Sequence, residues 1–563
     1  MSQKFTSSEE EMIRIMRDPV LWAKTHMNAE PRWYQEQVLR HPHNRTALRM
    51  GRRTGKCIAE GQRVVNADTG EYLPVEDLFK RQFNTLFSLN NQYKISKDQS
   101  FRVERNGIKP VYGVKVGGGA EVELTGNHPV LTIKGWKEVD DLEIGEYIAV
   151  PKKLPVFGKH AVTKEEAQLK GFVLGAYSHT KQGLVLKFHN ESIRNDIVEI
   201  FKGAGVPIFP KSSQNYFLID KKKLFTEITK EEHAKIPEEV FQYSEEALRA
   251  FLAAMFDTRS WLKTKPILEI GFQTLSPHLV KDLKHLLLRF GIRASIEERK
   301  KGNTIYNILL LRSRDEIATF CKKIGKYGLQ DYDDFLAQDT GTRSYSNTIP
   351  QPVWERIEYT MKQKNLKPSD VTGPNERFRK KINLPEEKAY QYGLAMKDEW
   401  LTNIGSSDVV WEKVMDIKSL GQKMTYDVSM PMYHNLVVED VCVHNTWTMR
   451  THMLWAAYTN IGGQKKEGYT DCLVATPYDS QARDIFDGLK KDINDNPILK
   501  DSVVSITQSP YRIKFKNGST ITLRTAGTRS SSGAASLRGL RADYLYLDKY
   551  FVPSSREASR ITM

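Results

Sequence analysis

Cysteine is scarce in this sequence, and long apolar runs are absent. Only four cysteines occur in 563 residues, at positions 57, 321, 442 and 472, too few for the disulfide framework of a small secreted protein. No apolar run approaches the roughly 18–20 residues that span a bilayer. The first residues, MSQKFTSSEEEMIRIM, lack the apolar segment of a secretion signal. These absences predict a cytoplasmic protein with free thiols and no membrane association.

Acidic residues are outnumbered by basic ones. The chain has 84 lysines and arginines against 69 aspartates and glutamates, a formal net charge of +15. Such an excess favours nucleic acid or another polyanion as a partner, although it says nothing about fold. Hydrophobic residues make up 40% and charged residues 27% of the chain, which is ordinary for globular domains. We therefore expect several globular domains, with DNA as a partner.

The sequence pattern changes several times along the chain and is nested. Short β-rich runs separated by turn residues cover residues 58–150 and return at residues 410–445. Between them, helical and strand patterns alternate over residues 165–335, and a charged helical pattern covers residues 345–400. After Thr446, helix and strand alternate as in α/β proteins. The pattern predicts a β-rich domain that is interrupted by an insert and is itself inserted into another protein.

A phosphate-binding loop is broken between Lys56 and Cys57. Residues 48–56 read LRMGRRTGK, and a P-loop needs a hydroxyl residue after its lysine to hold Mg²⁺. Removing residues 57–445 places Thr446 after Lys56, and the joined sequence GRRTGK–TWTMRTH contains that hydroxyl. GRRTGK alone is equally consistent with a basic surface turn. The motifs described below predict the same deletion, and this agreement favours the P-loop over a surface turn.

The restored loop and the sequence after it resemble the ATPase domain of phage terminase large subunits. LVATPYDSQARDIF resembles the strand, loop and helix after the P-loop helix, and SGAASLRGLRADYLYLD the segment leading to the Walker B aspartate. The resemblance implies an α/β fold that uses ATP and Mg²⁺ once residues 57–445 are removed. It also implies DNA, a small terminase subunit and a portal as partners, in the cytoplasm of a phage-infected bacterium. The implied nucleotide-binding residues are Gln35, Gly51, Arg52, Arg53, Thr54, Gly55, Lys56, Thr446 and Asp548, with Thr446 and Asp548 on Mg²⁺.

The resemblance to terminases is incomplete at two positions. Met50 replaces the first glycine of the general P-loop pattern, and Lys549 follows Asp548 where terminases carry a catalytic glutamate. The last residues, FVPSSREASRITM, resemble nothing expected there. We therefore expect the joined product to be inactive or incomplete as a motor.

Both ends of the removable segment resemble an intein, the self-excising element of protein splicing. CIAEGQRVVNADTG resembles the N-terminal block, TGNHPVLT the second block, and MTYDVSMPMYHNLVVEDVCVHN the two C-terminal blocks. The resemblance covers nearly all of residues 57–445 and implies an all-β, horseshoe-shaped splicing domain of the Hint type. The splicing residues it implies are Cys57, Thr125, His128, Asp427, His434, His444, Asn445 and Thr446.

The N-terminal residues of this set suit the opening of a peptide bond. Cys57 would attack the carbonyl of Lys56, because a thiol with a pKa of about 8.5 is a useful nucleophile near neutrality. His128 would protonate the leaving nitrogen, and Thr125 would position the scissile peptide or stabilise the oxyanion. Cys442 lies in an alternating apolar run, so we expect it in the core rather than in the site.

The C-terminal residues suit the transfer and release that complete splicing. Thr446 would take over the acyl group, with Asp427 as acid, base or orienting group. Asn445 would cyclise through its amide and cleave its own peptide bond, assisted by His444 and, as a second helper, His434. This scheme requires no metal and no ATP.

Residues of about 160–340 resemble a LAGLIDADG homing endonuclease, which has an α+β fold. In that family two helices pack closely, and each ends in a carboxylate that binds Mg²⁺ for DNA cleavage. The candidate helices are LKGFVLGAY (169–177) and LAAMFDTRS (252–260), and their small residues are Gly171, Gly175, Ala253 and Ala254. At the positions where the family carries its metal-binding carboxylates, this chain has Ala176 and Arg259. Asp257 lies two residues before the second of these positions. We expect weak or absent nuclease activity with DNA binding retained, or else an insert without a DNA role.

These patterns together predict a multidomain chain. The expected order is an ATPase part at 1–56, splicing-domain parts at 57–155 and 405–445, a LAGLIDADG-like domain at 156–345, a helical segment at 346–404 that includes a candidate helix-turn-helix, and the ATPase continuation at 446–563. Two alternatives remain open. One is a DNA-packaging ATPase with a passive insert, and the other is a DNA-binding homing endonuclease.

Overall fold

The chain divides into two compact units. One comprises Cys57–Val428 and Asn435–His444, and the other Met1–Lys56, Ser429–His434 and Asn445–Met563. The computed structural model describes residues 7–27, 40, 57–80, 85–99, 102–180, 183–187, 194–210, 216–219, 231–263, 268–325, 347–372, 378, 382–430, 433, 435–444, 448–460, 468–476, 479–494, 496–525 and 542–547.

An antiparallel sheet of eleven strands forms the β-rich domain of the first of these units. Its order is β1-β7-β6-β21-β10-β8-β23-β22-β2-β3, with β9 paired to β8 and β1 paired also to β21. The strands are β1 (Ile58–Ala59), β2 (Arg63–Val65), β3 (Tyr72–Pro74), β6 (Arg102–Val116), β7 (Glu121–Thr125), β8 (Pro129–Thr132), β9 (Gly135–Glu138), β10 (Tyr147–Pro151), β21 (Val409–Ser429), β22 (Asn435–Val438) and β23 (Val441–His444). A hairpin of β4 (Thr85–Leu89) and β5 (Ile95–Gln99), and helix α4 (Val75–Lys80), complete it.

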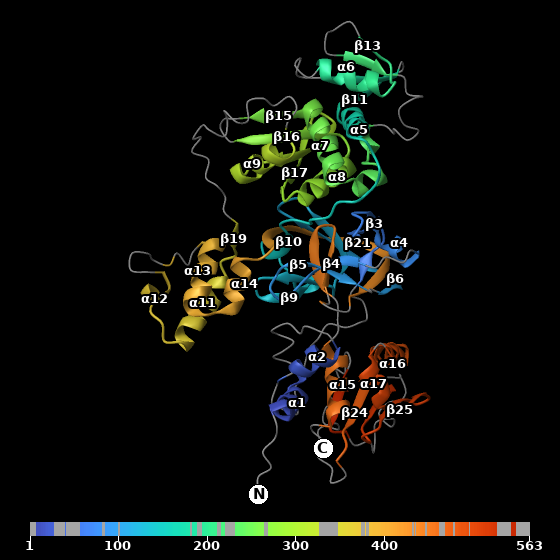
Figure 1. Cartoon of the computed structure of the whole chain (residues 1–563), viewed down its shortest axis with the longest axis vertical. Coiled ribbons are helices and arrows are strands. Elements are labelled where there is room, and N and C mark those ends of the chain that lie inside the picture. Colours follow the sequence, from blue (N-terminus) through green and yellow to red (C-terminus); the bar gives the residue numbers. More distant parts are fainter. Residues whose placement is uncertain are drawn as a thin grey trace. The chain divides into compact units, whose positions relative to one another are not determined.

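The two β-rich stretches of the sequence meet in this one domain. In Figure 1 the orange strand β21 lies among the blue strands of residues 57–150. Strand β21 pairs with β10 over five residue pairs, from Tyr147↔Lys413 to Pro151↔Val409, and with β1 at Ile58↔Tyr426. The expected all-β domain with an insert is therefore confirmed.

The insert is an α+β domain whose two halves have the same plan. In each half a helix leads directly into a four-stranded antiparallel sheet, in the orders β11-β12-β14-β13 and β15-β16-β18-β17. The first half contains α5 (Lys164–Ala176), β11 (Tyr177–Thr180), β12 (Gly183–Lys187), α6 (Arg194–Gly203), β13 (Ile208–Pro210) and β14 (Tyr216–Ile219). The second contains α7 (Glu245–Arg259), β15 (Ser260–Lys263), β16 (Glu269–Thr274), α8 (Pro277–Arg289), β17 (Ser295–Lys301), β18 (Thr304–Leu311) and α9 (Arg314–Lys323).

Helices α5 and α7 pack closely through their small residues, as expected. A Cβ added to Gly171 would lie 2.3 Å from the Phe251 carbonyl oxygen, and one added to Gly175 would lie 2.1 Å from Thr258 Oγ1. Ala254 lies 2.9 Å from the same imagined Cβ of Gly171. Only residues without bulk at these positions allow the two backbones to approach this closely.

A small helical segment follows the insert and leads back to the splicing domain. It contains β19 (Thr348–Ile349), α11 (Val353–Gln363), α12 (Pro368–Thr372), β20 (Leu384–Pro385), α13 (Glu386–Met396) and α14 (Glu399–Gly405). The charged helical pattern of the sequence is confirmed, and the pairing of β19 with β20 was not expected. Helix α12 is only five residues long, so the helix-turn-helix remains a prediction.

The second unit has α/β architecture. Its sheet order is β25-β26-β27-β24-β28, and the central β24 is parallel to both of its neighbours. Its elements are α1 (Ser7–Arg17), α2 (Pro19–Met27), α15 (Thr448–Thr459), β24 (Asp471–Thr476), α16 (Asp479–Asn494), α17 (Pro497–Ser502), β25 (Val503–Gln508), β26 (Tyr511–Phe515), β27 (Thr520–Thr525) and β28 (Tyr544–Leu547). Trp22, Leu454 and Phe486 belong to one buried core, so segments from both ends of the sequence fold together.

The first helical stretch is broken at Asp18. Pro19 has no backbone N–H and is tolerated at the start of a helix, and the Val20 N–H donates to Asp18 Oδ1 at 2.8 Å. Asp18 therefore caps α2 and separates it from α1. Among the described residues, no helix is long and apolar enough to cross a bilayer.

Candidate active site

Cys57 is fixed between two strands at the start of β1. Ile58, the next residue, pairs with Tyr426 of β21 on one side and with Leu124 of β7 on the other. The Cys57 N–H donates to Thr125 Oγ1 at 2.9 Å, and the Thr125 N–H donates to the Cys57 carbonyl oxygen at 3.0 Å. Cys57 is fully buried. Both sides of its backbone are therefore held by Thr125.

His128 lies in the same site, one turn after Thr125. Its Nδ1 is 3.2 Å from the Cys57 carbonyl oxygen, and the imidazole is buried. The His128 N–H donates to the Thr125 carbonyl at 2.9 Å, which closes the turn. The structure thus places Thr125 on the nitrogen of the bond that would be cut, and His128 on the next carbonyl.

Gly126 is required by the packing of this turn, and sequence reasoning missed it. The Asp140 N–H donates to the Gly126 carbonyl at 2.6 Å, and a Cβ on Gly126 would lie 1.9 Å from Asp140 Oδ1. The Val139 N–H donates to the His128 carbonyl at 3.0 Å. Residues 139–140 therefore clamp the Thr-Gly-Asn-His turn. The glycine within that motif was the only signal in the sequence.

The Cys57 thiol has polar partners that the sequence did not indicate. Asn106 Nδ2 is 3.0 Å and Lys109 Nζ is 3.4 Å from Cys57 Sγ. Both residues lie on β6, far from Cys57 in the sequence, and Thr425 of β21 also hydrogen-bonds the thiol. Burial raises the pKa of the Cys57 thiol, the negative charge of Asp427 raises this pKa further, and Lys109 lowers it. The thiol is thus kept protonated in the buried site, with a cation beside it.

Asp427, a predicted site residue, lies near the Cys57 thiol. It lies on β21, the strand that pairs with β1, and its negative charge contributes to the raised pKa of the Cys57 thiol. The carboxylate and the thiol are therefore brought together across more than 360 residues of sequence by one strand pairing.

The C-terminal end of the splicing domain is the hairpin β22–β23. Asn435 pairs with His444, Val438 with Val441, and β23 joins the sheet at Val443↔Val130. His444 therefore lies at the open end of the hairpin, beside the strand that follows His128. The side chain of His444 lies outside the described residues.

Asn435 holds this hairpin to β4, and sequence reasoning did not single it out. Its amide exchanges two hydrogen bonds with the Leu89 backbone, at 2.7 and 2.9 Å. Ser88 Oγ donates to the Asn435 carbonyl at 2.6 Å. Asn435 is fully buried. Its side-chain amide therefore links β4 to the hairpin, although β4 pairs with β5 and not with β22.

Cys442 lies on the same hairpin and is buried in the hydrophobic core. This placement agrees with the expectation of a core thiol. Several predicted residues cannot be placed. Those outside the described residues are Gln35, Gly51, Arg52, Arg53, Thr54, Gly55, Lys56, His434, Asn445, Thr446, Asp548 and Lys549.

The residues at the ends of α5 and α7 do not fit a divalent-metal nuclease centre. Arg259 ends α7, Ala176 ends α5, and neither residue can supply a carboxylate. Burial raises the pKa of Asp257 to about 9, so this acid is protonated near neutrality and poorly suited to Mg²⁺, which prefers ionised carboxylates. No group of three or more metal-ligating side chains occurs among the residues that the structure describes.

The fold and the site together define a class of protein. An all-β domain holds an N-terminal cysteine between strands, contacts it with a Thr-x-x-His turn, and closes with a hairpin that ends at His444. This arrangement is that of a self-processing splicing domain. The sequence model of the intein splicing domain matches residues 64–445, and the chain belongs to the intein family.

Parts of other known proteins are also similar to this chain. The chain is 26% identical over 439 residues to the replicative DNA helicase DnaB of Rhodothermus marinus, covering 70% of this chain and 46% of that protein. The chain spans about half the length of the curated relatives it matches.

Two solved structures illustrate the range of similarity. A mini-intein variant of Ssp DnaB shares 13% identity with a TM-score of 0.24, covering 69% of this chain and 99% of its own. I-DmoI in complex with DNA and Mn shares 15% identity with a TM-score of 0.21, covering 29% of this chain and 96% of its own.

Proposed function

We propose that the chain excises residues 57–445 and joins Lys56 to Thr446. The observation that carries this proposal is the capture of Cys57 on both sides of its backbone by Thr125 and His128. The division of the chain into compact units at Lys56/Cys57 and at His444/Asn445 supports it. A segment that folds as its own compact unit can be excised without unfolding the flanking segments that are joined.

The first step is an acyl shift from nitrogen to sulfur. Cys57 Sγ attacks the Lys56 carbonyl carbon, the Lys56–Cys57 amide bond breaks, and a thioester and a free α-amine form. Thr125 holds the departing nitrogen through its Oγ1, and the imidazole of His128 supplies the proton that this nitrogen needs. Lys109, near the sulfur, favours the developing thiolate.

The remaining steps transfer and release the flanking chains. Thr446 Oγ attacks the thioester, which releases the Cys57 thiol and leaves an ester-linked branch. The Asn445 side-chain nitrogen then attacks its own carbonyl, forming a cyclic imide and freeing the Thr446 amine. That amine attacks the ester, and an ordinary Lys56–Thr446 amide results. Asp427 assists the exchange between the two nucleophiles, and His444 assists the cyclisation.

We propose further that the host is a P-loop ATPase of the terminase large-subunit type. The joined sequence GRRTGK–TWTMRTH supports this proposal, as does a unit in which β24, β27 and β28 are parallel and flanked by helices. ATP and Mg²⁺ are then ligands of the spliced product only, because Lys56 and Thr446 are adjacent only after splicing. DNA, a small terminase subunit and a portal are its partners. Lys549 in place of a glutamate predicts a product without ATPase activity.

The purified full chain tests the proposed splicing. Its mass is followed over time at several temperatures, and we expect the chain to be replaced by a 57–445 fragment and a ligated product that contains the peptide bond Lys56–Thr446. Cys57→Ala combined with Asn445→Ala abolishes both products.

Cys321→Ala is the matched control, since Cys321 is a free thiol of the insert outside this site. It should splice like the unmodified chain. A chain that stays full length under all conditions, with its β-rich unit folded by circular dichroism, would contradict the proposal.

A further inference from the structure

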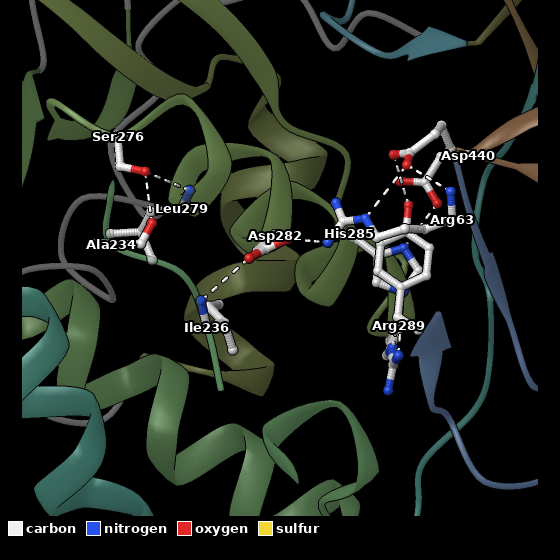
Figure 2. A network of polar contacts seen from close by, with 11 residues as sticks. Arg63, Ala234, Ile236, Ser276, Leu279, Asp282, His285, Arg289 and Asp440 are labelled. Atoms are coloured by element: carbon white, nitrogen blue, oxygen red, sulfur yellow. Dashed lines mark hydrogen bonds and ion pairs between the residues drawn. The ribbon is translucent and has the colours of Figure 1, made fainter. Parts of the chain in front are cut away.

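A buried polar network joins helix α8 of the insert to the turn of the β22–β23 hairpin. His285 Nδ1 is 2.8 Å from Asp440 Oδ1, and both side chains are buried. Figure 2 shows that Asp282 of α8 contacts Arg63 and that His285 of α8 contacts Asp440 of the splicing domain. The two domains therefore meet through specific polar contacts, which fix one orientation more strictly than apolar packing does.

The hairpin turn has a backbone conformation that its residues disfavour. Val438 and Val441 pair directly, so Glu439 and Asp440 form a two-residue turn, with φ of 45° and 61°. Such turns prefer Asn-Gly, because left-handed backbone is unfavourable for residues with a Cβ. Neither residue is a glycine or an asparagine. The contacts of their side chains must therefore hold this turn.

Both turn residues are in fact held. Glu439 Oε1 accepts from the Arg63 N–H at 2.8 Å, and the Tyr72 hydroxyl donates to Glu439 Oε2 at 3.0 Å. Arg63 in turn donates to Asp282 of α8 at 2.6 Å. Glu439 is thus fixed by strands of its own domain, whereas Asp440 is fixed by the insert.

His285 is held in one orientation and one tautomer. Its ring stacks on Tyr72 with centroids 3.9 Å apart and planes 6° apart. Arg289 Nη2 lies 3.2 Å from His285 Nε2, and arginine only donates, so Nε2 accepts and Nδ1 carries the proton toward Asp440. Burial lowers the pKa of His285, although Asp440 opposes this. A neutral imidazole with a fixed Nδ1–H is therefore the donor to Asp440.

We propose that His285 is a positioning residue for the C-terminal half of splicing, acting through Asp440 on the hairpin that ends in His444 and Asn445. Strand β23 has only four residues, about 13 Å at roughly 3.3 Å per residue. If the turn relaxes or tilts at Asp440, the other end of this short strand, at His444, is displaced. The nuclease-like insert thereby contributes to splicing geometry. This inference rests on the proposed splicing reaction.

The N-terminal step should depend much less on His285. Cys57, Thr125 and His128 are held by hydrogen bonds among themselves and to residues 139–140. None of these bonds includes a member of the His285 network. The Asn435 contacts to Leu89 also remain when His285 is replaced, so the hairpin should stay folded but less well aligned.

Two separate rates in the full chain test the proposal. Cleavage after Asn445 is followed in a Cys57→Ala background, and hydroxylamine cleavage at Lys56 is followed in an Asn445→Ala background. We expect His285→Ala to slow the first rate by about tenfold to a hundredfold, the size expected for a misplacement near 1 Å. The second rate should change by less than about threefold, well below that range.

Rescue and control variants separate positioning from folding. His285→Asn keeps an N–H donor near the Nδ1 position and should recover most of the C-terminal rate. His278→Ala, at the exposed first turn of the same helix and not hydrogen-bonded to the network, should leave both rates unchanged. Equal losses of both rates in His285→Ala, or an unchanged C-terminal rate, would overturn the proposal. A parent chain that shows neither cleavage would instead refute the proposed splicing itself.

Discussion

The polar atoms of Cys57 are all engaged. Its nitrogen donates to Thr125 Oγ1, its oxygen accepts from the Thr125 N–H and lies beside His128 Nδ1, and its sulfur contacts Asn106 and Lys109. Such fixed geometry lowers the entropic barrier to attack on the neighbouring carbonyl. At the residue scale the site is therefore preorganised around Cys57, the proposed first nucleophile.

The pH dependence of the first step follows from the charges near this thiol. Burial raises the pKa of Cys57, so the thiolate fraction at neutral pH is below that of a free cysteine. In the Asn445→Ala background, the rate of hydroxylamine cleavage at Lys56 should keep rising with pH beyond about 8.5, the ordinary pKa of a cysteine.

Two variants move this profile in opposite directions. Lys109→Met removes a cation that lowers the pKa of Cys57, so its inflection should move to higher pH. Asp427→Asn removes an anion that raises this pKa, so its inflection should move to lower pH. Lys109→Arg keeps the charge and serves as the control. Shifts of the same sign in Lys109→Met and Asp427→Asn would show that electrostatics at the sulfur does not set the profile.

Two pairs of elements decide the geometry of the larger unit. Helices α5 and α7 pack so closely that Gly171 and Gly175 leave no space for a side chain. The hairpin β22–β23 is held at one end by Asn435 and at its turn by α8. At the element scale the insert thus has a defined contact to the turn of the hairpin that ends at His444.

The close packing of α5 and α7 gives a stability prediction. Gly171→Ala places a Cβ 2.3 Å from the Phe251 carbonyl oxygen, and overpacking of this kind costs about 1–3 kcal/mol. We expect a lower midpoint in urea unfolding followed by tryptophan fluorescence. Gly203→Ala, in α6, meets no atom within 4 Å and should be neutral or slightly stabilising. Equal effects of the two variants would refute the tight helix contact.

The whole molecule consists of one unit inserted into another. The flanking α/β unit is assembled from segments at both ends of the sequence, with Trp22 and Leu454 in one core. It can therefore fold before splicing joins its two parts. The proposed P-loop, by contrast, is complete only when Lys56 and Thr446 are neighbours.

The insert should have lost DNA cleavage. Ala176 and Arg259 stand where two metal-binding carboxylates are needed, and Asp257 is buried with a raised pKa. We expect no specific double-strand break when the full chain is incubated with Mg²⁺ or Mn²⁺ and duplex DNA that encodes the joined sequence. Gel-shift experiments on the same duplex report any retained binding. A discrete cleavage product that disappears with EDTA would overturn the assignment.

The sequence by itself predicted the ends of the element and the residues proposed to act there. Cys57, Thr125 and His128 lie in short sequence motifs that can be recognised without knowing the fold. The proposed P-loop can be recognised in the same way, because its residues become adjacent in sequence when residues 57–445 are removed. The nested organisation also followed from local patterning, because strand and helix periodicities are local properties.

Only the tertiary structure decided which distant residues complete the site. Asn106, Lys109 and Thr425 reach the thiol because β6 and β21 lie near β1 in the sheet, and His285 reaches Asp440 because α8 docks on a turn 155 positions away. Such contacts depend on strand pairing and domain docking, which no local pattern encodes. The physical reason is that a short motif specifies which reactive side chains are present. The distances between these side chains and the residues that shift their pKa or orient them are set by packing between segments far apart in the chain.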